Sequence, residues 1–500
     1  MERELVGRST LLVNPPLVGG VAFTRQGRCQ ERQETLGTTK PPYSLAVLAA
    51  LLRQRGRQFR LVDQTGERIS TETVVERLDR DGFEPTLIVF CSTVPTLAAD
   101  VTEMAKLKRR YRAPLVCFGP HASCAPIEAM QRAPEVDAMI VGEPEDAVLA
   151  LTELQSIEEV DHIPAIVWRR SGAIVPNRAR GTFEGFRDMP FPAWDLLPLK
   201  GYRLPLVSKP YLLVETSRGC PYSCDFCVVP YFHGHNFRER SAKALVDDIE
   251  RAHRELSIDY FYLWGDTVTL NVKSFSQFCE ELIARRLAVK WLANARADNL
   301  QDLAFVRRLR QSGCWMLSMG VESASDDTRR DMMKRLEREK IAVAFANLRR
   351  AGIKSFGFFI YGYPGDTVAS MEKTTRYAVE LDADFANFYP AVPYPGTALH
   401  EKCRRDGLLT TDDWSRMEYS YYVLRGNGLD ERTVMHALNQ ARRRFFLRPS
   451  YLARHLGEIL RIAITDQRLV WELAWRMLFG KADAASAGEG RALEDHVSQV

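Results

Sequence analysis

The chain has 500 residues, of which 46% are hydrophobic and 26% are charged, an ordinary globular composition over a length that predicts two or three domains. Its formal net charge of +4, without any basic run interleaved with aromatic residues, gives no indication of a nucleic-acid partner. The sequence shows neither a signal peptide nor about 18 uninterrupted apolar residues, so we expect a cytoplasmic protein.

Short apolar runs alternate with amphipathic stretches in the first 155 residues. The pattern predicts strands and helices at these positions: strands Thr10–Val13, Phe59–Val62, Thr86–Cys91, Pro114–Phe118 and Ala138–Val141, helices Ser44–Arg55, Thr71–Leu78 and Leu97–Arg110. Such alternation with short connections is typical of a doubly wound, Rossmann-like α/β domain with a parallel sheet. Ligands of these sheets bind at the carboxyl ends of the strands. The residues at those ends are Ser92, Thr93, Gly119, Gly142 and Glu143.

A predicted hairpin, Ala165–Trp168 with Ala173–Pro176, and a proline-rich connector make up residues 156–208, where we place the main domain boundary. The alternation then resumes over residues 209–400 and fits an open or partial (β/α)6 barrel, whose reactive face is the carboxyl-terminal one. Six strands are predicted there: Tyr211–Glu215, Tyr260–Trp264, Lys290–Ala293, Trp315–Met319, Ser355–Ile360 and Phe385–Tyr389. Residues 401–480 are predicted to be a helical region, and residues 481–500 a disordered tail.

Three of the ten cysteines, Cys220, Cys224 and Cys227, lie within eight residues directly after the first predicted strand of the barrel. A cytosolic chain does not use them as a disulfide framework, because that compartment keeps thiols reduced. Three thiolates at the spacing C-x3-C-x2-C can ligate three irons of a [4Fe–4S] cluster and leave the fourth iron open. The alternative is a Cys3His zinc site, since His233 and His235 follow. The position after a barrel strand favours the cluster.

Residues 211–399 resemble the radical S-adenosylmethionine (SAM) superfamily, which is identified by this cysteine spacing with an aromatic residue, Phe226, before the last cysteine. The resemblance implies that the open iron binds SAM and that a reducing partner such as flavodoxin or ferredoxin supplies one electron. It also implies a set of SAM-binding residues, on strands that follow the cysteines: Gly265, Asp266, Arg296, Glu322, Ser323 and Gly362. Trp264 and Asp266 depart from the family's Gly-Gly-Glu element at this position.

Residues 10–154 resemble the cobalamin-binding domain that precedes many radical SAM domains, through motifs such as Asn14-Pro15-Pro16 and Val141-Gly142-Glu143-Pro144-Glu145. This resemblance implies that Ser92, Thr93, Gly119, Gly142 and Glu143 line the cobalamin site. The loop that carries the cofactor's histidine ligand in cobalamin mutases reads Asp63-Gln64-Thr65-Gly66 here, so we expect cobalamin to bind without one. The alternative is a Rossmann-like domain that binds no corrin.

The tandem order implies a cobalamin-dependent radical SAM methyltransferase. It would use the 5′-deoxyadenosyl radical and methylcobalamin to methylate an unactivated carbon of a small molecule, for example a lipid or a natural-product precursor. One alternative is an anaerobic oxidative cyclase of the magnesium-protoporphyrin ester type. Another, from a different class, is a non-catalytic corrinoid or redox sensor, which would not need the SAM-binding residues.

Cationic and apolar residues recur at helical spacing over Arg442–Lys481. Helices of this kind pack their apolar stripe on a protein core while arginine stems cover its rim. Helices with the same pattern also lie on membrane surfaces, with arginine toward anionic headgroups. Amphipathic helices are far commoner in the first role, so we expect these helices to cap the barrel.

Overall fold

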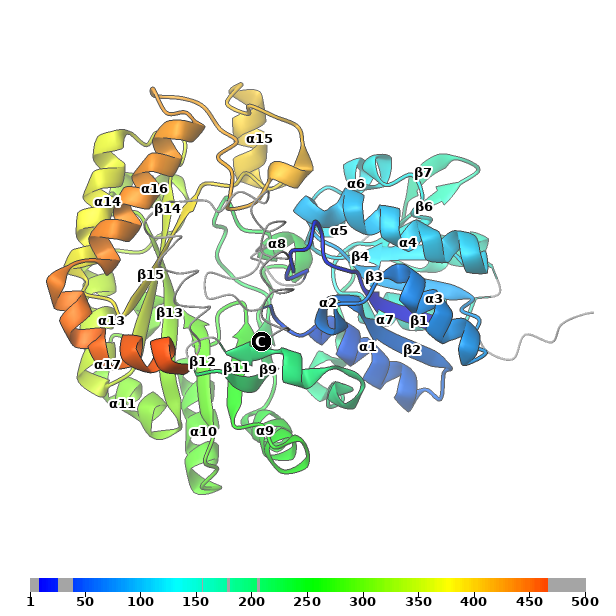
Figure 1. The fold of residues 1–500 in the computed structure, drawn as a ribbon, viewed down its shortest axis with the longest axis horizontal. Coiled ribbons are helices and arrows are strands. Elements are labelled where there is room, and N and C mark those ends of the chain that lie inside the picture. The colour runs from blue at the N-terminus through cyan, green and yellow to red at the C-terminus, as the bar shows by residue number, and fades with distance from the viewer. Residues whose placement is uncertain (1–8, 26–38, 155, 178–179, 205–206, 466–500) are drawn as a thin grey trace, which may run out of the picture.

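The computed structural model describes residues 9–25, 39–154, 156–177, 180–204 and 207–465. Two parallel-stranded α/β units lie side by side, with the first sheet on the right of Figure 1 and the second, more strongly curved sheet on the left. The part of the expected helical region beyond residue 465 and the tail at 481–500 lie outside the described residues, as does one of the ten cysteines, Cys29.

The first sheet has the strand order β2-β1-β3-β4-β5-β6-β7, and its first five strands are parallel. The strands are β1 (Thr10–Asn14), β2 (Phe59–Asp63), β3 (Leu87–Cys91), β4 (Leu115–Phe118), β5 (Ala138–Ile140), β6 (Ile166–Arg170) and β7 (Ala173–Pro176). The helices are α1 (Tyr43–Gln54), α2 (Gln64–Glu67), α3 (Thr71–Arg80), α4 (Leu97–Tyr111), α5 (Pro120–Cys124), α6 (Pro126–Arg132) and α7 (Glu145–Leu151). The expected doubly wound sheet is confirmed.

Both faces of the first sheet are covered by helices. Leu11 and Ile88 point to the face that packs against α3 and α4, and the neighbouring Leu12 and Val89 point to the face that packs against α1 and α7. Strands that are buried on both sides have continuous apolar sequences, which is why β1 and β3 lack the alternation of a half-exposed strand.

The hairpin of β6 and β7 differs from the expectation that it belongs to a linker. It extends the first sheet, because β6 pairs antiparallel with β5, with Trp168 opposite Ala138. Trp168 is only 1% exposed, so this pairing buries the hairpin's large apolar residue. A local hairpin pattern indicates that two strands pair with each other, but it does not indicate which third strand they join.

The second sheet has the order β10-β9-β11-β12-β13-β14-β15, with β8 also on β9. The strands are β8 (Arg203–Leu204), β9 (Lys209–Arg218), β10 (Arg238–Glu239), β11 (Tyr260–Gly265), β12 (Lys290–Ala295), β13 (Cys314–Glu322), β14 (Lys354–Tyr361) and β15 (Phe385–Pro390). Six of them are parallel and only β8 and β10 run antiparallel to β9. The curled, open sheet confirms the expected partial barrel.

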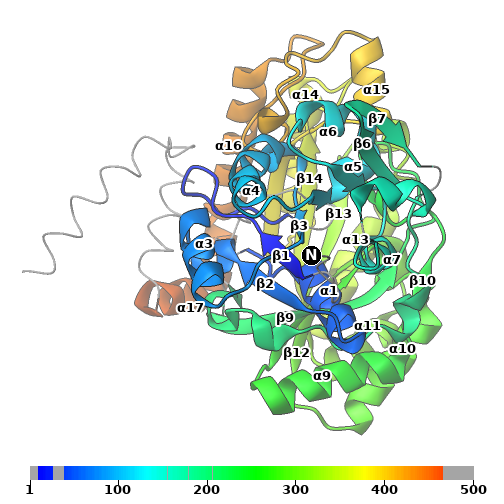
Figure 2. The same cartoon turned by 90° about the vertical axis from the view of Figure 1, so that its right-hand side faces the viewer.

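The helices of this half are α8 (Val229–Phe232), α9 (Ala242–Leu256), α10 (Val272–Ala284), α11 (Leu303–Gln311), α12 (Asp326–Asp331), α13 (Arg338–Ala351), α14 (Val368–Glu380), α15 (Ala398–Arg405), α16 (Glu431–Phe446) and α17 (Pro449–Thr465). Helices α9, α10, α11, α13 and α14 cover the outer side of the sheet (Figures 1 and 2). Several begin at a side chain that accepts a hydrogen bond from the first turn, such as Ser241 before α9 and Thr367 before α14.

The C-terminal helices pack on the barrel as far as they are described. Phe445 of α16 is fully buried against Phe388 of β15, and Arg442 donates a hydrogen bond to the Phe388 carbonyl over 3.1 Å. Arg448 and Arg454 form ion pairs with Asp382 at 3.3 and 2.6 Å. None of the helices within the described ranges is long and apolar enough to cross a membrane.

The two halves are joined by apolar packing. Tyr394, Trp414, Met417 and Val423 lie beyond the barrel strands, yet they belong to the same buried cluster as the α3 and α4 face of the first sheet. Helix α5 of the first half contacts α8, which follows the three cysteines. In Figure 1, α8 accordingly lies between the two sheets.

Candidate functional site at the cysteine loop

The three cysteines lie on a loop that leaves the end of β9. Gly219 turns the chain there with φ +86°, and a side chain at this position would bring a Cβ within 2.1 Å of the Asn236 carbonyl oxygen. The Cys220 N–H donates to the Gly234 carbonyl over 3.0 Å, and the Cys227 N–H donates to the Cys224 carbonyl over 3.1 Å. None of the three cysteines is in a disulfide, and all three are half-buried.

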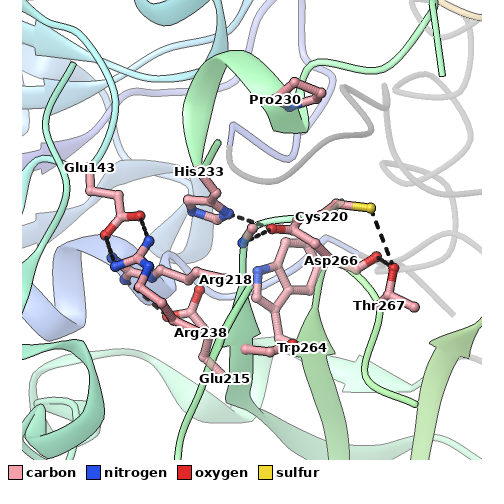
Figure 3. Close-up of polar contacts among 12 residues, drawn as sticks. Glu143, Glu215, Arg218, Cys220, Pro230, His233, Arg238, Trp264, Asp266 and Thr267 are labelled. Atoms are coloured by element: carbon pink, nitrogen blue, oxygen red, sulfur yellow. Dashed lines mark hydrogen bonds and ion pairs between the residues drawn. The ribbon is translucent and has the colours of Figure 1, made fainter. Parts of the chain in front are cut away.

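Asp266 holds this loop from the end of β11. One of its carboxylate oxygens accepts a hydrogen bond from the Gly219 N–H over 2.8 Å and also lies 2.8 Å from Nδ1 of His233 (Figure 3). Next to it, the Thr267 hydroxyl lies 3.7 Å from the Cys220 sulfur. Gly265 permits this approach, because a Cβ there would lie 2.7 Å from two β9 hydroxyls. Gly265 and Asp266, both predicted SAM ligands, thus lie directly beside the cysteines.

The two histidines that suggested a zinc site contact other groups. Burial lowers the pKa of His233, but the carboxylate of Asp266 outweighs burial and leaves its pKa above the ordinary value. Nδ1 of His235 lies 3.2 Å from the Cys220 carbonyl oxygen. A zinc ion requires ligands about 2.0–2.3 Å from one centre. Within the described ranges, no three His, Cys, Asp or Glu side chains are gathered closely enough to hold a single ion.

Asp225, between two of the cysteines, ties the loop to three further segments. Its carboxylate accepts a hydrogen bond from the Tyr363 hydroxyl over 2.6 Å, at the end of β14. Its backbone N–H donates to the Met332 carbonyl over 3.2 Å, and its own carbonyl accepts from the Leu399 N–H over 2.9 Å. Burial raises the pKa of Asp225, although the bond from Tyr363 opposes that rise. The loop is therefore held from β14, α12 and α15 at once.

Arg296, Glu322 and Lys334 form a second group of charged side chains. Arg296 bonds Asp298 over 2.9 Å, and its guanidinium lies 3.6 Å from the ring centre of Tyr222 in the cysteine loop. Glu322 accepts from the Lys334 ammonium over 2.7 Å, and the two side chains are 7% and 11% exposed. The Lys334 carbonyl in turn accepts from Arg296 over 3.3 Å.

This group lies close to the cysteines. Burial raises the pKa of the Cys224 thiol, while the positive charges of Lys334 and Arg296 oppose that rise and the negative charge of Glu322 adds to it. The structure therefore brings Arg296 and Glu322, both predicted from the sequence, together with Cys224. Lys334 is a further residue that the sequence analysis missed. It lies between helices in a segment without a motif, and the left-handed backbone of its neighbours Met333 and Arg335 is visible only in the structure.

Ser323 and Gly362, also predicted as SAM ligands, make structural contacts. The Ser323 hydroxyl is buried and accepts a hydrogen bond from the Ser325 N–H over 3.1 Å at the start of α12. Gly362 has φ +70°, and its carbonyl accepts from the Tyr422 hydroxyl over 3.0 Å. A Cβ at Gly362 would lie 2.6 Å from the Tyr422 ring. This glycine thus allows the C-terminal segment to close over the strand end.

The predicted cobalamin residues lie at the strand ends of the first sheet. The Ser92 hydroxyl bonds Asp100 over 2.8 Å, and the Asp100 carboxylate pairs with buried Arg25 at 2.7 Å. Thr93 is fully buried, and its hydroxyl has no hydrogen-bond partner among the described residues. Gly119 and Gly142 have φ +144° and +90°, which favour glycine. At Gly142 the backbone of Gly181 fills the space of a side chain, 2.5 Å from an added Cβ. This edge therefore offers the unpaired hydroxyl of Thr93 and the bare backbone of Gly119.

Glu143 belongs to the same edge, but its carboxylate faces the barrel. It accepts from Arg218 of β9 over 2.9 Å and from Arg238 of β10 over 3.2 Å (Figure 3). Arg218 also bonds Glu145 at 2.7 Å and Glu215 at 3.0 Å. These five residues, which we call the interdomain ion cluster, join the two halves within two residues of Cys220.

Two sequence families match this chain. The model of the radical SAM superfamily matches residues 214–378, and the model of the B12-binding domain matches residues 34–152. The first match contains the cysteine loop, Arg296 and Glu322, and the second contains the strand ends with Thr93 and Gly142. The matched regions therefore coincide with the two halves of the site.

Relatives with both regions extend over most of the chain. An uncharacterized methyltransferase of Pyrococcus horikoshii is 27% identical over 461 residues, which are 91% of this chain and 96% of that protein. An anaerobic magnesium-protoporphyrin IX monomethyl ester cyclase of Cereibacter sphaeroides is 25% identical over 82% of this chain and 67% of its own length.

Two solved structures share the fold. OxsB, a cobalamin-dependent S-adenosylmethionine radical enzyme, superposes with a TM-score of 0.70 at 16% identity, over 99% of this chain and 76% of OxsB. The radical S-adenosylmethionine methyltransferase TsrM from Kitasatospora setae gives 0.65 at 18% identity, over 80% of this chain and 78% of TsrM. These structures share the fold, and the two family matches identify its parts: the chain carries a B12-binding domain ahead of a radical SAM domain.

Proposed function

We propose that this protein is a cobalamin-dependent radical SAM methyltransferase acting on an unactivated carbon of a small molecule. The observation that carries the proposal is the position of the cysteine loop. It lies at the strand ends of the barrel, beside Arg296, Glu322 and Lys334, and it is joined through Arg218 to the strand-end edge of the B12-binding domain. The two expected cofactor sites are therefore joined by direct side-chain contacts, as transfer between two cofactors and one substrate requires.

The donor set fits a [4Fe–4S] cluster. Cys220, Cys224 and Cys227 supply three thiols outside any disulfide, the ligand type that iron–sulfur clusters take, on a loop held by hydrogen bonds from four directions. No fourth cysteine follows in the loop, which leaves one iron for SAM. When bound, the cluster and SAM supply radical chemistry and cobalamin supplies a methyl group.

The charges near Cys224 match those of SAM, which carries a carboxylate and an ammonium group. Arg296 and Lys334 present positive charge suited to the carboxylate, and Glu322 and Asp266 present negative charge suited to the ammonium. Gly265, Ser323 and Gly362 keep the surrounding strand ends in place by close packing and backbone hydrogen bonds. SAM would be oriented by this set.

The first sheet offers a fitting edge for cobalamin. Thr93 carries a buried hydroxyl without a partner among the described residues, a group that a ligand can satisfy. Ser92 lies beside it, and Gly119 has no side chain that would keep a ligand from its backbone. The position of the cofactor's histidine ligand in the mutases is taken by Thr65, whose hydroxyl donates to the Pro15 carbonyl over 2.6 Å and accepts from Arg25 over 3.0 Å. Cobalamin would accordingly bind without a histidine from this loop.

Methyl transfer is favoured by the relative that matches the chain over nearly its whole length and is named a methyltransferase. The second candidate is an oxidative cyclase, because a magnesium-protoporphyrin ester cyclase matches 82% of the chain. Flavodoxin or ferredoxin would act as the reducing partner in either case. The substrate would be a small molecule such as a lipid or a natural-product precursor.

The test uses the full chain, reconstituted anaerobically with iron, sulfide and hydroxocobalamin and then given SAM and dithionite. We expect about four irons per chain, 5′-deoxyadenosine from SAM cleavage, and S-adenosylhomocysteine from methyl transfer to cobalamin. Replacing Cys220, Cys224 and Cys227 together by Ala should abolish iron binding and 5′-deoxyadenosine. Formation of 5′-deoxyadenosine without S-adenosylhomocysteine would favour the cyclase, and bound cofactors with neither product would indicate a sensor.

A further inference from the structure

Glu143 connects the two halves of the molecule at their functional edges. It directly follows Gly142 at the end of β5, within the edge that we assign to cobalamin, and a bridge between Gly142 and Gly181 holds its backbone. Its carboxylate leaves this edge and accepts hydrogen bonds from Arg218 over 2.9 Å and from Arg238 over 3.2 Å. A second oxygen of Glu143 also pairs with Arg238.

The ion cluster is buried and contains more acids than bases. The side chains of Glu143 and Glu145 are fully buried, and those of Arg218 and Glu215 are 3% exposed. Buried charges are tolerated only when well paired, so breaking one pair leaves an uncompensated charge. Arg218 bonds acids from both halves at the same time. These bonds can all form only when the segment Glu143–Glu145 of the first half and the end of β9 keep one relative position.

The cluster continues directly into the cysteine loop. Arg218 is followed by Gly219, whose N–H donates to Asp266, and then by Cys220. Asp266 in turn contacts His233, which lies between Glu143 and Cys220 in Figure 3. A displacement of the Glu143 carboxylate would therefore be passed through Arg218 to the backbone that carries the first cysteine.

We propose that Glu143 is a positioning residue that couples the two cofactor sites. It fixes the cysteine loop relative to the strand-end edge of the B12-binding domain, so that filling the cobalamin site changes the surroundings of the cluster. Coupling between two sites is reciprocal, so a loaded cluster changes the affinity for cobalamin by the same factor. This inference rests on the proposed function, because it requires that both cofactors bind.

The experiment compares the reduced cluster with and without hydroxocobalamin, by electron paramagnetic resonance and by its midpoint potential. In the wild type we expect cobalamin to change both the spectrum and the potential. In Glu143→Gln both cofactors should still load, but the change should be lost or several-fold smaller. The matched control is Glu215→Gln, which removes an equally buried acid from the same Arg218 but within the barrel itself. It should keep the change.

A second variant covers the case in which Glu143→Gln fails to fold. Arg238→Gln removes the other partner of Glu143 from the edge strand β10, where its side chain is 14% exposed, and it should also lose the coupling. Cobalamin affinity, measured with and without the cluster, should differ in the wild type and agree in this variant.

The outcomes separate the inference from the proposed function. Failure of the wild type to load either cofactor contradicts the proposed function. Loading of both cofactors with no effect of cobalamin on the cluster overturns the inference. The inference is also overturned if Glu143→Gln keeps the full effect of cobalamin on the cluster, or if Arg238→Gln does so when the first variant does not fold. It is overturned as well if Glu215→Gln loses this effect as completely as Glu143→Gln.

Discussion

Glu322 adopts a backbone conformation that most residues avoid. Its φ of +65° lies in the left-handed region, which costs a non-glycine residue about 1–3 kcal/mol and persists where the surroundings impose it. Here the pairing of β13 with β14 shifts its register between Gly320 and Glu322, and the Glu322 carboxylate bonds Lys334. Strained residues of this kind cluster at ligand sites, which agrees with the position of Glu322 near Cys224.

Lys334 gives a prediction at the scale of one residue. Lys334→Met removes a positive charge that we assign to the SAM carboxylate, and a charged hydrogen bond contributes roughly 1.5–3 kcal/mol. We therefore expect the dissociation constant for SAM, measured by equilibrium dialysis, to rise by about ten- to a hundredfold. Iron content should stay near that of the wild type.

The control for this variant is Lys340→Met, which removes the same charge from an exposed lysine paired with Glu337 at 3.3 Å. It should leave SAM binding unchanged. If Lys334→Met binds SAM as tightly as the wild type while holding its cluster, the assigned role of Lys334 is wrong.

At the scale of elements, the turn from β9 into the cysteine loop depends on Gly219. A side chain there meets two penalties: the positive φ of +86° and the Asn236 carbonyl 2.1 Å from its Cβ. We expect Gly219→Ala to shift the loop, to lower iron incorporation several-fold and to reduce the midpoint of urea unfolding. The backbone term alone costs about 1–2 kcal/mol.

Gly172 provides the matched control. Its φ is +85°, nearly that of Gly219, but no atom lies within 4 Å of an added Cβ. Gly172→Ala should therefore show the backbone penalty alone, with normal iron content. Equal losses of iron in the two variants would mean that contact with Asn236 does not position the loop.

The sequence predicts elements better than contacts between elements. Strand–helix alternation and the cysteine spacing predicted the parallel strands of both sheets and the loop after β9, because these patterns are local; the antiparallel strands β6, β7, β8 and β10 were not assigned to the sheets. The pairing of Glu143 with Arg218 joins residues 75 positions apart in different halves, and no periodicity reports it. Lys334 was missed for the same reason, since its importance comes from Glu322 and Cys224 in space. The individual ligand assignments stay predictions.

The C-terminal helices allow a prediction on membrane attachment. Arg442, Arg448 and Arg454 bond carbonyl or carboxylate groups of the barrel, and of these the Arg454 side chain is 41% exposed. We therefore expect the protein to stay in the supernatant when sedimented with anionic liposomes, even at low salt, where attraction to the surface is strongest. Sedimentation with the liposomes that is lost on adding salt would instead show an electrostatic membrane contact.

At the scale of the whole molecule, the ion cluster makes the joint between the two halves sensitive to acid. Burial acts to raise the pKa of Glu143, but the charges of Arg218 and His233 and the hydrogen bond from Arg238 outweigh it, so its pKa lies below the ordinary value of 4.5. A carboxylate with a lowered pKa stabilises the fold above pH 4.5, and this contribution is lost as the pH falls toward the folded-state pKa.

We therefore expect the urea midpoint of the wild type to fall more steeply between pH 5 and pH 3 than that of Glu143→Gln, which has no carboxylate to protonate at this position. Buried Asp63 and Asp225 have pKa values raised by burial, which works in the opposite direction, but they are present in both proteins and cancel in the comparison. Equal pH dependence would contradict the role of Glu143 in the joint.

The effect of salt should distinguish the buried pair of Glu143 and Arg218 from the exposed pair of Glu72 and Lys106. The hydrogen bond from Lys106 lowers the pKa of Glu72 to about 2, but Glu72 lies at the surface. At about 1 M salt the screening length is near 3 Å, so exposed pairs lose most of their attraction and buried pairs keep it. The difference in acid sensitivity between wild type and Glu72→Gln should vanish at high salt. The difference between wild type and Glu143→Gln should persist, because solvent ions do not reach a fully buried carboxylate.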